Sequence, residues 1–288
     1  MRYSVVIPAR NSARTLGTTL DAIVGGTRQP DEILVVDGCS DDGTHDLARA
    51  RGVLVVTNEK RHVAAARQLG VTTATGDVVA FTDSDCVPAA DWLQRVAAHF
   101  DEHRDLDGVG GPVFLSTPRN DIQRYSAQVF ESIMHFPETA RFVTRKGMEG
   151  SFAGANCVYR RPTVLAAGGF RDEFTNHAEE IDLFWRLIDR GAKLLFDPLL
   201  RVEHLDYADT LSRLIRTNFN YGFASTKLAK YHIGTQFDFI LYRIWMKSFA
   251  STLNPLRRDR WAPLRCLQIG SFIAGKICSS VLLGTVNL

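Results

Sequence analysis

The sequence predicts an α/β fold: a doubly wound, mostly parallel sheet flanked by helices. Short apolar runs alternate with segments of helical periodicity through the first half of the chain, and strands separated by helices of this length favour parallel pairing with right-handed crossovers. A chain of 288 residues, 45% of them hydrophobic, can bury a large core as one domain or as one domain with an extension. This architecture is typical of nucleotide-binding proteins, although a fold alone does not define a function.

The first strand is expected over Val5–Ile7 and to stop at Pro8, because proline cannot donate to a strand ladder. A loop over Ala9–Ser12 then leads into a helix. Three apolar residues mark one face of this helix: Leu16, Leu20 and Ile23. The next elements, in chain order, are a strand over Ile33–Val36, a helix over Thr44–Arg51 with Gly52 as its stop, a strand over Val53–Val56, a helix over His62–Val71 and a strand over Val78–Phe81.

Two later stripes of large apolar residues are expected to lie in the core. The first consists of Trp92, Leu93, Val96 and Phe100, and the second of Phe130, Ile133 and Phe136.

The strand over Val78–Phe81 ends in the acidic triplet Asp83-Ser84-Asp85. If the backbone stays extended there, Asp83 and Asp85 point to the same side and Ser84 turns away. Two neighbouring carboxylates repel each other unless a cation or a proton lies between them, and oxygen ligands favour Mg²⁺ or Mn²⁺. Ligands of open α/β sheets bind at this end of the strands. The alternative is an acidic turn that caps the next helix.

The first strand-to-helix loop contains no glycine that would let a dinucleotide pyrophosphate approach. It reads Pro8-Ala9-Arg10-Asn11, which excludes both a glycine-rich NAD-binding turn and a G-K-[ST] phosphate loop. Asp37, at the end of the second strand, could accept hydrogen bonds from a ribose or a base. Its alternative role is to close the turn into Gly38.

Charge is distributed unevenly along the chain. Residues 1–200 hold 22 Lys and Arg against 27 Asp and Glu, whereas residues 201–288 hold 12 against 5. The basic end therefore suits an anionic surface. The five cysteines form no C-x-x-C pair, which is typical of a reduced, cytosolic setting. The opening segment Tyr3–Pro8 is expected to be a strand rather than a signal peptide.

Several blocks in the right order resemble the family 2 glycosyltransferases of the GT-A fold. They are Ser4–Asn11, Val35–Thr44, Gly76–Asp85, Gly154–Arg160, Gly168–Phe170 and Glu179–Leu187, within a match that covers about residues 3–222. The resemblance implies a GT-A-type mixed, mostly parallel sheet with a C-terminal helical extension. It also implies inverting, metal-dependent transfer of a sugar from a nucleotide diphosphate sugar to an acceptor hydroxyl.

The expected division has a catalytic domain over residues 1–205, with a nucleotide-sugar half over about 1–115 and an acceptor half over about 116–205. A helical, basic and aromatic extension occupies residues 206–288.

On this basis Asp85 is the expected direct ligand of Mn²⁺ or Mg²⁺, and Asp83 is a further candidate that the resemblance places nearer the ribose. The resemblance adds His204 as a metal or diphosphate contact, with a structural histidine as the alternative. Glu180 is the expected general base, on the opposite side of the sugar from the leaving group. The helix that Glu180 begins would turn Ile181, Phe184, Trp185 and Ile188 towards the core, and its acids would otherwise only complement the helix dipole.

The remaining site residues divide between donor and acceptor. The expected donor contacts are Pro8, Ala9, Arg10, Asn11, Asp37, Arg67, Asp83 and Ser84. The expected acceptor contacts are Gly154, Asn156, Glu179, Trp185 and Arg186. Arg67 could bind a phosphate or form a salt bridge on a solvated helix face, and Trp185 could stack on a sugar or pack in the core.

Two positions depart from the usual pattern of the family. Asp37-Gly38 stands where two acidic residues are usual, so one nucleotide contact is missing. Glu179-Glu180 stands where a Glu-Asp pair is usual, which lengthens the base by one methylene group and alters the acceptor pocket.

The extension is expected to contain helices over about Thr210–Lys230, Phe237–Met246 and Leu264–Leu283. The last has only ten uncharged residues in a row, Cys266–Gly275, fewer than the about 20 that span a bilayer. An interfacial helix pair that meets anionic lipid is one interpretation, which suits a lipid-linked acceptor and a cytoplasmic membrane face. The alternatives are a cap on the sheet or a homodimer seam. No nucleic-acid motif accompanies the charge.

The donor nucleotide could be UDP, GDP or dTDP, with UDP favoured. Two other functions stay open. A nucleotidyltransferase would also use paired acids and a metal, but it is expected to carry a glycine-rich first loop, which residues 9–12 do not form. A binding or scaffold protein could keep the fold without turnover.

Overall fold

The computed structural model describes residues 1–134, 136–147, 150–175, 177–232, 246, 250 and 260–284. The chain forms two compact units. Unit 1 comprises Met1–Thr117, Ser132–Thr175 and Glu179–Asp206, and unit 2 comprises Pro118–Glu131, Asn176–Ala178 and Tyr207–Leu288. Compared with the expected division at residue 205, unit 2 also takes in most of one earlier helix, Asp121–Ile133.

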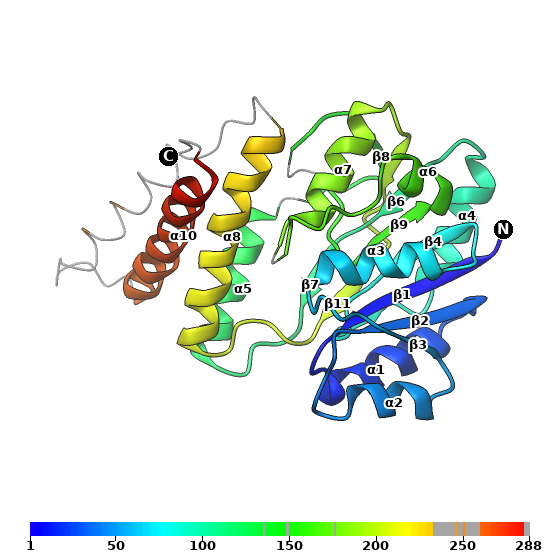
Figure 1. The fold of residues 1–288 in the computed structure, drawn as a ribbon, viewed down its shortest axis with the longest axis horizontal. Helices are drawn as coiled ribbons and strands as arrows, with labels where there is room; N and C mark the ends of the chain where they lie inside the picture. Colours follow the sequence, from blue (N-terminus) through cyan, green and yellow to red (C-terminus); the bar gives the residue numbers. More distant parts are fainter. Residues whose placement is uncertain are drawn as a thin grey trace. The chain divides into compact units, whose positions relative to one another are not determined.

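Unit 1 contains a mixed sheet of eight strands in the order β3-β2-β1-β4-β9-β6-β10-β8 (Figure 1). Its strands are β1 Tyr3–Ala9, β2 Glu32–Asp37, β3 Leu54–Thr57, β4 Val78–Phe81, β6 Gly108–Gly110, β8 Arg141–Val143, β9 Cys157–Arg160 and β10 Leu194–Phe196. A smaller sheet has the order β5-β11-β7, with β5 Cys86–Pro88, β7 Val113–Leu115 and β11 Val202–His204. The first four strands are parallel, and β9 pairs antiparallel with both β4 and β6. The predicted fold class is confirmed.

The helices of unit 1 are α1 Ala13–Val24, α2 Thr44–Ala50, α3 Val63–Thr73, α4 Trp92–Glu102, α6 Arg161–Ala166 and α7 Glu179–Asp189. The strand order 3-2-1-4 means that the chain first builds outward from β1 and then returns to its other side. With right-handed crossovers, α1 and α2 cover one face of the sheet and α3 covers the other. The direction in which strands are added to the sheet therefore reverses between β1 and β4. Open α/β sheets bind ligands at such a switch point, outside the carboxyl ends of the strands.

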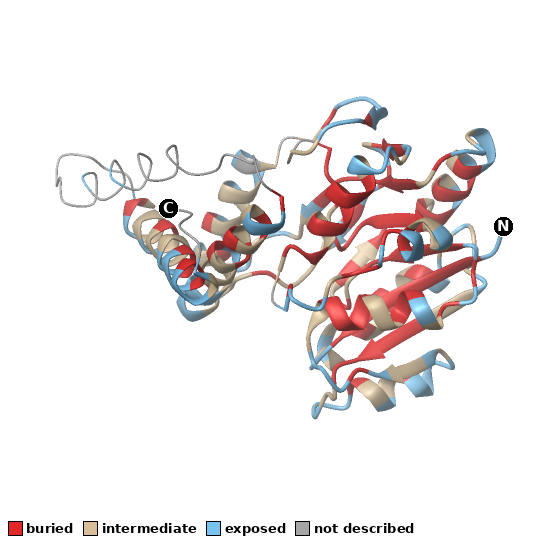
Figure 2. Cartoon of the chain, turned by 45° about the horizontal axis from the view of Figure 1, so that its top comes forward, coloured by how far each residue is buried: buried red, intermediate tan, exposed pale blue. Residues whose placement is uncertain are grey.

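The core lies around the central strands, which Figure 2 shows in red. Every residue of β1 and of β4 is buried, as expected for parallel strands covered on both faces. The predicted apolar faces of α1 and α4 are also buried: Leu16, Leu20 and Ile23 on α1, and Trp92, Leu93, Val96 and Phe100 on α4.

Pro8 does not stop the first strand, which continues to Ala9. Val6 and Pro8 direct their main-chain groups to the same side of β1, towards β4, because the period of a strand is two residues. Val6 is the last residue of β1 that pairs with β4, so Pro8 removes no hydrogen bond from that ladder. Pairing with β2, on the other side of β1, continues as far as Ala9.

Other apolar predictions are less accurate. Phe130 and Phe136 are half-buried rather than in the core, and nothing is described of the Ile133 side chain. In α7, Phe184 is buried as expected, but Ile181 and Ile188 are only half-buried. The helix expected over residues 237–246 lies outside the described residues, except for Met246.

Unit 2 is built around α8 Leu211–Tyr231 and α10 Ala262–Leu283, which lie side by side, together with α5 Asp121–Ile133 (Figure 1). Glycines allow the two long helices to approach closely. A β-carbon on Gly222 would overlap the carbonyl oxygen of Phe272, and one on Gly275 would overlap that of Phe219. Each glycine therefore lies against the main chain of the other helix, and the two contacts are related as in an antiparallel helix pair.

Substitution of Gly222 by Ala is expected to destabilise unit 2 by about 1–3 kcal/mol, because the main chain of α10 must move away. Gly17→Ala in α1 is the matched control, since its β-carbon would meet only the flexible end of Arg51, at 3.3 Å. Both changes gain helix propensity, so Gly17→Ala should be neutral or stabilising. Thermal unfolding of both variants tests the prediction, and an unchanged melting temperature for Gly222→Ala would contradict it.

Among the described residues, α10 is the helix whose length and composition would allow it to cross a membrane, with 22 residues and a mean hydropathy of 1.6. The sequence argument counted only uninterrupted apolar residues and judged this segment too short. The structure joins both sides of Lys276 into one helix that has just two charged residues, Arg265 and Lys276. Length and composition therefore do not exclude a span.

Candidate active site

Two loops meet at the carboxyl ends of the neighbouring strands β1 and β4. One follows β1 and contains Ser12, and the other follows β4 and contains the acidic triplet. The Ser84 hydroxyl donates to the Ser12 hydroxyl at 2.8 Å, and the main-chain N–H of Thr82 bonds to the carbonyl of Val6. Ser84 is buried. It fastens the acidic loop to the first loop.

The loop after β1 is held by hydrogen bonds rather than by glycine. Asn11 has a φ of 51°, a conformation that asparagine tolerates better than most residues, and its side-chain oxygen accepts from the N–H of Asp41 at 3.1 Å. The Arg10 guanidinium donates to the carbonyl of Arg61 at 3.1 Å, while Pro8 and Ala9 are buried in β1. A nucleotide-sugar donor could therefore contact the main chain of this loop and the exposed part of the Arg10 side chain.

Asp37 closes its own loop. It is buried, and its carboxylate accepts hydrogen bonds from the N–H and the hydroxyl of Ser40. The alternative in which Asp37 is a turn residue is thus confirmed, and a contact from Asp37 to a nucleotide stays a prediction.

The acidic triplet is a turn and not an extended segment, because the N–H of Cys86 bonds back to the carbonyl of Asp83 at 3.1 Å. The carboxylates nevertheless stay accessible, with side chains 31% exposed for Asp83 and 24% for Asp85. The His204 imidazole, from β11, places Nε2 3.7 Å from Oδ1 of Asp85. The pairing of β11 with β5, in register from His204 to Cys86, brings this histidine to the turn.

The donor set fits a divalent metal. Ligand atoms of Asp83, Cys86 and His204 lie within 4.8 Å of one another. Burial, and also the nearby Asp83 and Asp206, raise the pKa of Asp85 to about 6, although His204 opposes the shift. Two carboxylates with an imidazole suit Mn²⁺, and carboxylates alone suit Mg²⁺. Burial, with Asp83 and Asp85 nearby, raises the pKa of the Cys86 thiol well above its ordinary value.

Within the described residues, Nδ1 of His204 is buried without a hydrogen-bond partner. An orphaned nitrogen on this ring is consistent with an imidazole whose partner binds from outside the chain.

Arg67, on α3, joins the acidic turn to the start of α7. Its guanidinium is 3% exposed and contacts Asp83 at 2.8 Å and the Glu179 carboxylate. The alternative of a salt bridge is therefore confirmed, but the expected solvated position is wrong. Burial lowers the pKa of Arg67, and the two carboxylates more than offset this, so the group stays charged. A guanidinium already shared by two protein carboxylates has little capacity left for phosphate.

Gly154 lies directly against this guanidinium. A β-carbon at that position would overlap the terminal nitrogens of Arg67. Gly154 therefore makes room for the ion cluster of Arg67, Asp83 and Glu179, which explains a glycine here without an acceptor contact.

Glu180 is half-buried in the first turn of α7, which begins after Ala178 at a φ of 74°. Burial raises the pKa of Glu180, Arg67 opposes the shift, and Asp83 adds to it. The Glu180 carboxyl therefore interacts electrostatically with Asp83 of the acidic turn. Burial and then Glu180 also raise the pKa of Glu179. Since Glu179 and Asp182 are buried and bound to arginines, they do more than complement the helix dipole.

Three expected acceptor contacts have internal roles instead. The Asn156 amide accepts from the Trp92 indole at 2.9 Å and donates to the carbonyls of Pro112 and Leu200, so none of its polar atoms is available to an acceptor. Arg186 is buried and donates to Asp182 and to the carbonyls of Ala167 and Gly169. Trp185 is 4% exposed, which confirms its core alternative.

The sequence argument missed Ser12 and Asp206. Ser12 was within the quoted first loop, but its bond to Ser84 spans 72 residues and has no local signal. Asp206 follows His204 by two residues, which is a visible signal, and it pairs with Arg14 at 2.7 Å.

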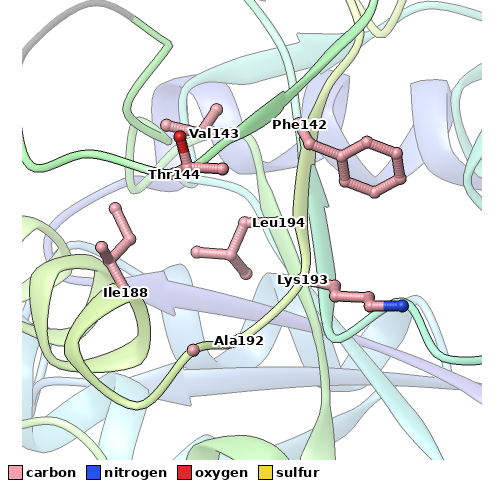
Figure 3. Close-up of a pocket in the computed structure, with 8 residues that line it drawn as sticks. Phe142, Val143, Thr144, Ile188, Ala192, Lys193 and Leu194 are labelled. Carbon is pink, nitrogen blue, oxygen red and sulfur yellow. The ribbon is translucent and has the colours of Figure 1, made fainter.

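A pocket of about 430 Å³ lies elsewhere, at the edge of the sheet formed by β8 and β10 (Figure 3). Its lining is mainly apolar, including Phe142, Val143, Ile188 and Leu194, with Lys193 at one side. Strands β9 and β6 separate this edge from β4. The residues that line the pocket include no acids, so we assign it no part in the chemistry of the acidic turn.

The fold is of the GT-A type, and the acidic turn follows β4, the strand that pairs with β1 on the side opposite β2. The model of glycosyl transferase family 2 matches residues 4–164, and the chain belongs to this family. It is 31% identical over 237 residues to the pre-mycofactocin glycosyltransferase of Mycobacterium tuberculosis, covering 80% of this chain and 48% of that protein. It is 33% identical over 203 residues to glycosyltransferase AglE of Haloferax volcanii, covering 67% and 63% respectively.

The chain spans about half the length of the first of these relatives. Solved structures agree in fold. The mannosyltransferase PcManGT from Pyrobaculum calidifontis, in complex with GDP-Man and Mn²⁺, matches with a TM-score of 0.61 and 18% identity, covering 96% of this chain and 86% of that one. TarS 1–349 of S. aureus, in complex with UDP-GlcNAc, matches with a TM-score of 0.60 and 16% identity, covering 100% and 93%.

Proposed function

We propose that this protein is an inverting glycosyltransferase that moves a sugar from a nucleotide diphosphate sugar to an acceptor hydroxyl, with Mn²⁺ or Mg²⁺. The observation that carries the proposal is the acidic turn of a family 2 chain. Asp83 and Asp85 lie in this turn with partly exposed side chains, and Nε2 of His204 lies 3.7 Å from Oδ1 of Asp85. Glu180 lies within electrostatic reach of that turn. Support for the donor comes from similar folds solved with UDP-GlcNAc and with GDP-Man.

Asp85 and His204, with Asp83 beside them, would hold the metal. A divalent cation supplies Lewis-acid stabilisation of the charge that builds on a departing diphosphate. Asp85 suits this role because its raised pKa shows that its charge is poorly stabilised by the protein alone. Arg67 holds Asp83 in place through their 2.8 Å contact, and Ser84 fixes the turn to the first loop.

Glu180 would take the proton from the acceptor hydroxyl as that oxygen attacks the anomeric carbon. Attack from the side opposite the leaving diphosphate inverts the configuration, so the base and the metal must lie on opposite sides of the sugar. The base needs its carboxylate form, and its raised pKa makes it a stronger base than an ordinary glutamate.

The donor nucleotide is UDP, GDP or dTDP, and we favour UDP. We infer a lipid-linked acceptor, because a 22% identical relative is named a glucosyl-dolichyl phosphate glucuronosyltransferase. Such an acceptor suits an enzyme that works peripherally at the cytoplasmic face of a membrane. The basic balance of residues 201–288, with 12 Lys and Arg against 5 Asp and Glu, supports this setting.

A thermal-shift panel of UDP, GDP and dTDP with and without Mn²⁺ tests the donor and the metal together. At about a hundredfold excess over Kd, a bound nucleotide should stabilise the protein by about 3 kcal/mol, and Mn²⁺ should increase this effect. Asp85→Ala should remove the increase, because the direct ligand is lost. Asp105→Ala, which removes an exposed partner of Lys193, is the matched control and should respond like wild type.

No Mn²⁺-linked shift with any nucleotide would contradict the proposed site. A clear shift without release of free nucleotide diphosphate from a donor sugar, in the presence of simple acceptors and of lipid-linked ones, would favour a binding protein that keeps the fold.

A further inference from the structure

Most of the exposed residues of helix α10 are apolar and lie on one face. Six of its outward residues are Leu267, Ala274, Ile277, Cys278, Val281 and Leu282. At 100° per residue they fall within an arc of about 140°, and none of them is charged or hydroxylated. Val281 and Leu282 are 76% and 70% exposed, far beyond what an apolar side chain in water usually shows when it has a core to join.

The polar residues of α10 lie on the opposite side, towards α8. Lys276, Ser279 and Ser280 are buried together with Gly275. Near the start of the helix, the Gln268 side chain accepts from the Tyr125 hydroxyl of α5. Ser271 lies within the outward arc, but its hydroxyl is bonded to the carbonyl of Leu267 in the preceding turn, which satisfies it within the helix.

This arrangement is the reverse of a helix on the surface of a water-soluble domain, whose apolar stripe faces the core and whose charges face solvent. Small residues at a close helix crossing, with large apolar residues turned outward, are typical of helices packed in lipid. The crossing of Gly222 and Gly275 has that form. Burial lowers the pKa of Lys276 to about 8. The charged form of Lys276 is therefore less stable in its inward position than it would be on a side facing water.

We propose that the outward face of α10 is a membrane-binding surface, embedded in the acyl boundary of an anionic bilayer with α8 on its water side. The inference deepens the proposed function, since it names the surface by which the enzyme would reach a lipid-linked acceptor. Its test uses no donor or acceptor.

The charges favour a helix that lies along the membrane over one that crosses it. Helix α8, packed against α10 along the opposite face, carries Arg213, Arg216, Lys227 and Lys230, and so many cations could not enter the hydrocarbon beside α10. On the water side of α10 they would instead be attracted by the negative potential of an anionic bilayer. Arg260 stacks on the Trp261 ring at 4.1 Å where α10 begins, and this pairing of an aromatic ring with a cation is typical of the membrane interface.

Charge also favours lipid over a second copy of the chain. From Arg260 to the end of the sequence there is no acidic residue, so a second copy of α10 would offer this basic segment no negative charge. An anionic bilayer supplies the missing negative charge.

The test is flotation of the full chain with vesicles of phosphatidylcholine alone and of phosphatidylcholine with phosphatidylglycerol, at low and at high salt. Wild type should float with the anionic vesicles, more strongly at low salt. Val281→Gln combined with Leu282→Gln should reduce partitioning into anionic vesicles by roughly tenfold to a hundredfold, because two inserted apolar side chains are lost. Both sites are exposed, so the melting temperature without lipid should not change.

The matched control is Val24→Gln combined with Leu54→Gln. These apolar residues are 54% and 48% exposed but lie in α1 and β3 of unit 1, and their loss should leave flotation unchanged. Wild type that fails to float with either vesicle, or a Val281/Leu282 variant that floats like wild type, would overturn the proposal.

Light scattering after gel filtration without lipid tests the competing occupant. A wild-type dimer that the Val281/Leu282 variant converts to a monomer, with no vesicle binding by either, would make the face a subunit contact and overturn the proposal. Vesicle binding by a protein that shows no sugar transfer would leave this inference standing while the proposed function failed.

Discussion

Glu180→Gln is expected to lower kcat for sugar transfer by about 10²–10⁴-fold while donor and Mn²⁺ binding are retained. The amide keeps the size and hydrogen-bonding shape of the side chain but cannot accept a proton. The loss should therefore fall on kcat, with KM for the donor little changed. The measurement is steady-state kinetics of nucleotide diphosphate release with saturating acceptor, alongside the thermal-shift response to donor and Mn²⁺.

The acid limb of the wild-type pH profile supplies a second reading of the same residue. Since burial raises the pKa of Glu180, the base becomes protonated at a higher pH than an ordinary glutamate, whose pKa is about 4.3. The rate should fall about tenfold per pH unit below that raised pKa, and this limb should be absent from the residual activity of Glu180→Gln.

Glu179→Gln distinguishes the two neighbouring acids. Glu179 is paired with Arg67, so its change should act mainly on stability. Normal turnover by Glu180→Gln, or a larger kcat loss in Glu179→Gln at a temperature where that variant is folded, would show that the base is assigned to the wrong residue.

Arg67→Met is expected to lower the free energy of unfolding by about 3–5 kcal/mol. Its removal leaves Glu179, which is 1% exposed, and Asp83 without the cation that they share, and an unpaired buried charge is costly. Urea denaturation measures the loss. Arg51→Met is the matched control: it breaks the ion pair of Arg51 with Asp21, whose side chains are 40% and 68% exposed, and should cost about 1 kcal/mol or less.

The deficit of Arg67→Met should depend on pH. Without Arg67, the already raised pKa of Glu179 rises further. A carboxyl whose pKa is raised in the folded state adds stability below its unfolded pKa, and that stability is lost as pH rises through the folded value. The difference from wild type should therefore shrink on acidification between the raised pKa and about 4.3.

A double variant, Arg67→Met with Glu179→Gln, should recover part of the loss, since both buried charges of that pair are then gone. A deficit of less than about 1 kcal/mol in Arg67→Met, or a double variant no more stable than the single one, would mean that the ion cluster contributes little to the fold.

Local patterns were enough to predict the strands and helices around the site. The apolar run Val78–Phe81 coincides with β4, and the stripes on α1 and α4 are buried as expected, because burial on one face imposes its period on the chain. Pro8 shows the limit of such patterns: whether a proline ends a strand depends on whether a neighbouring strand needs its N–H, and the sequence does not say where that neighbour stops.

Partners distant in sequence could not be predicted. Arg67 and Glu179 are 112 residues apart, and Asn156 is 64 residues from Trp92. The sequence offered Arg67 as a phosphate ligand and Asn156 as an acceptor contact, since a polar residue in a matching block can serve a ligand or the protein itself. Only packing decides which of these it does.

By itself the sequence determined the chemistry that can occur at the end of β4: two carboxylates with a serine between them, and a glutamate pair further on. The tertiary structure decided which of these groups remain open to a ligand. In the structure the triplet forms a turn, Ser84 donates a hydrogen bond to Ser12, and Arg67 is paired with Asp83 and Glu179 inside the protein. It also turned the apolar face of α10 outward. Identity of a residue follows from the chain, but its exposure and its partners follow from which distant segments pack against it.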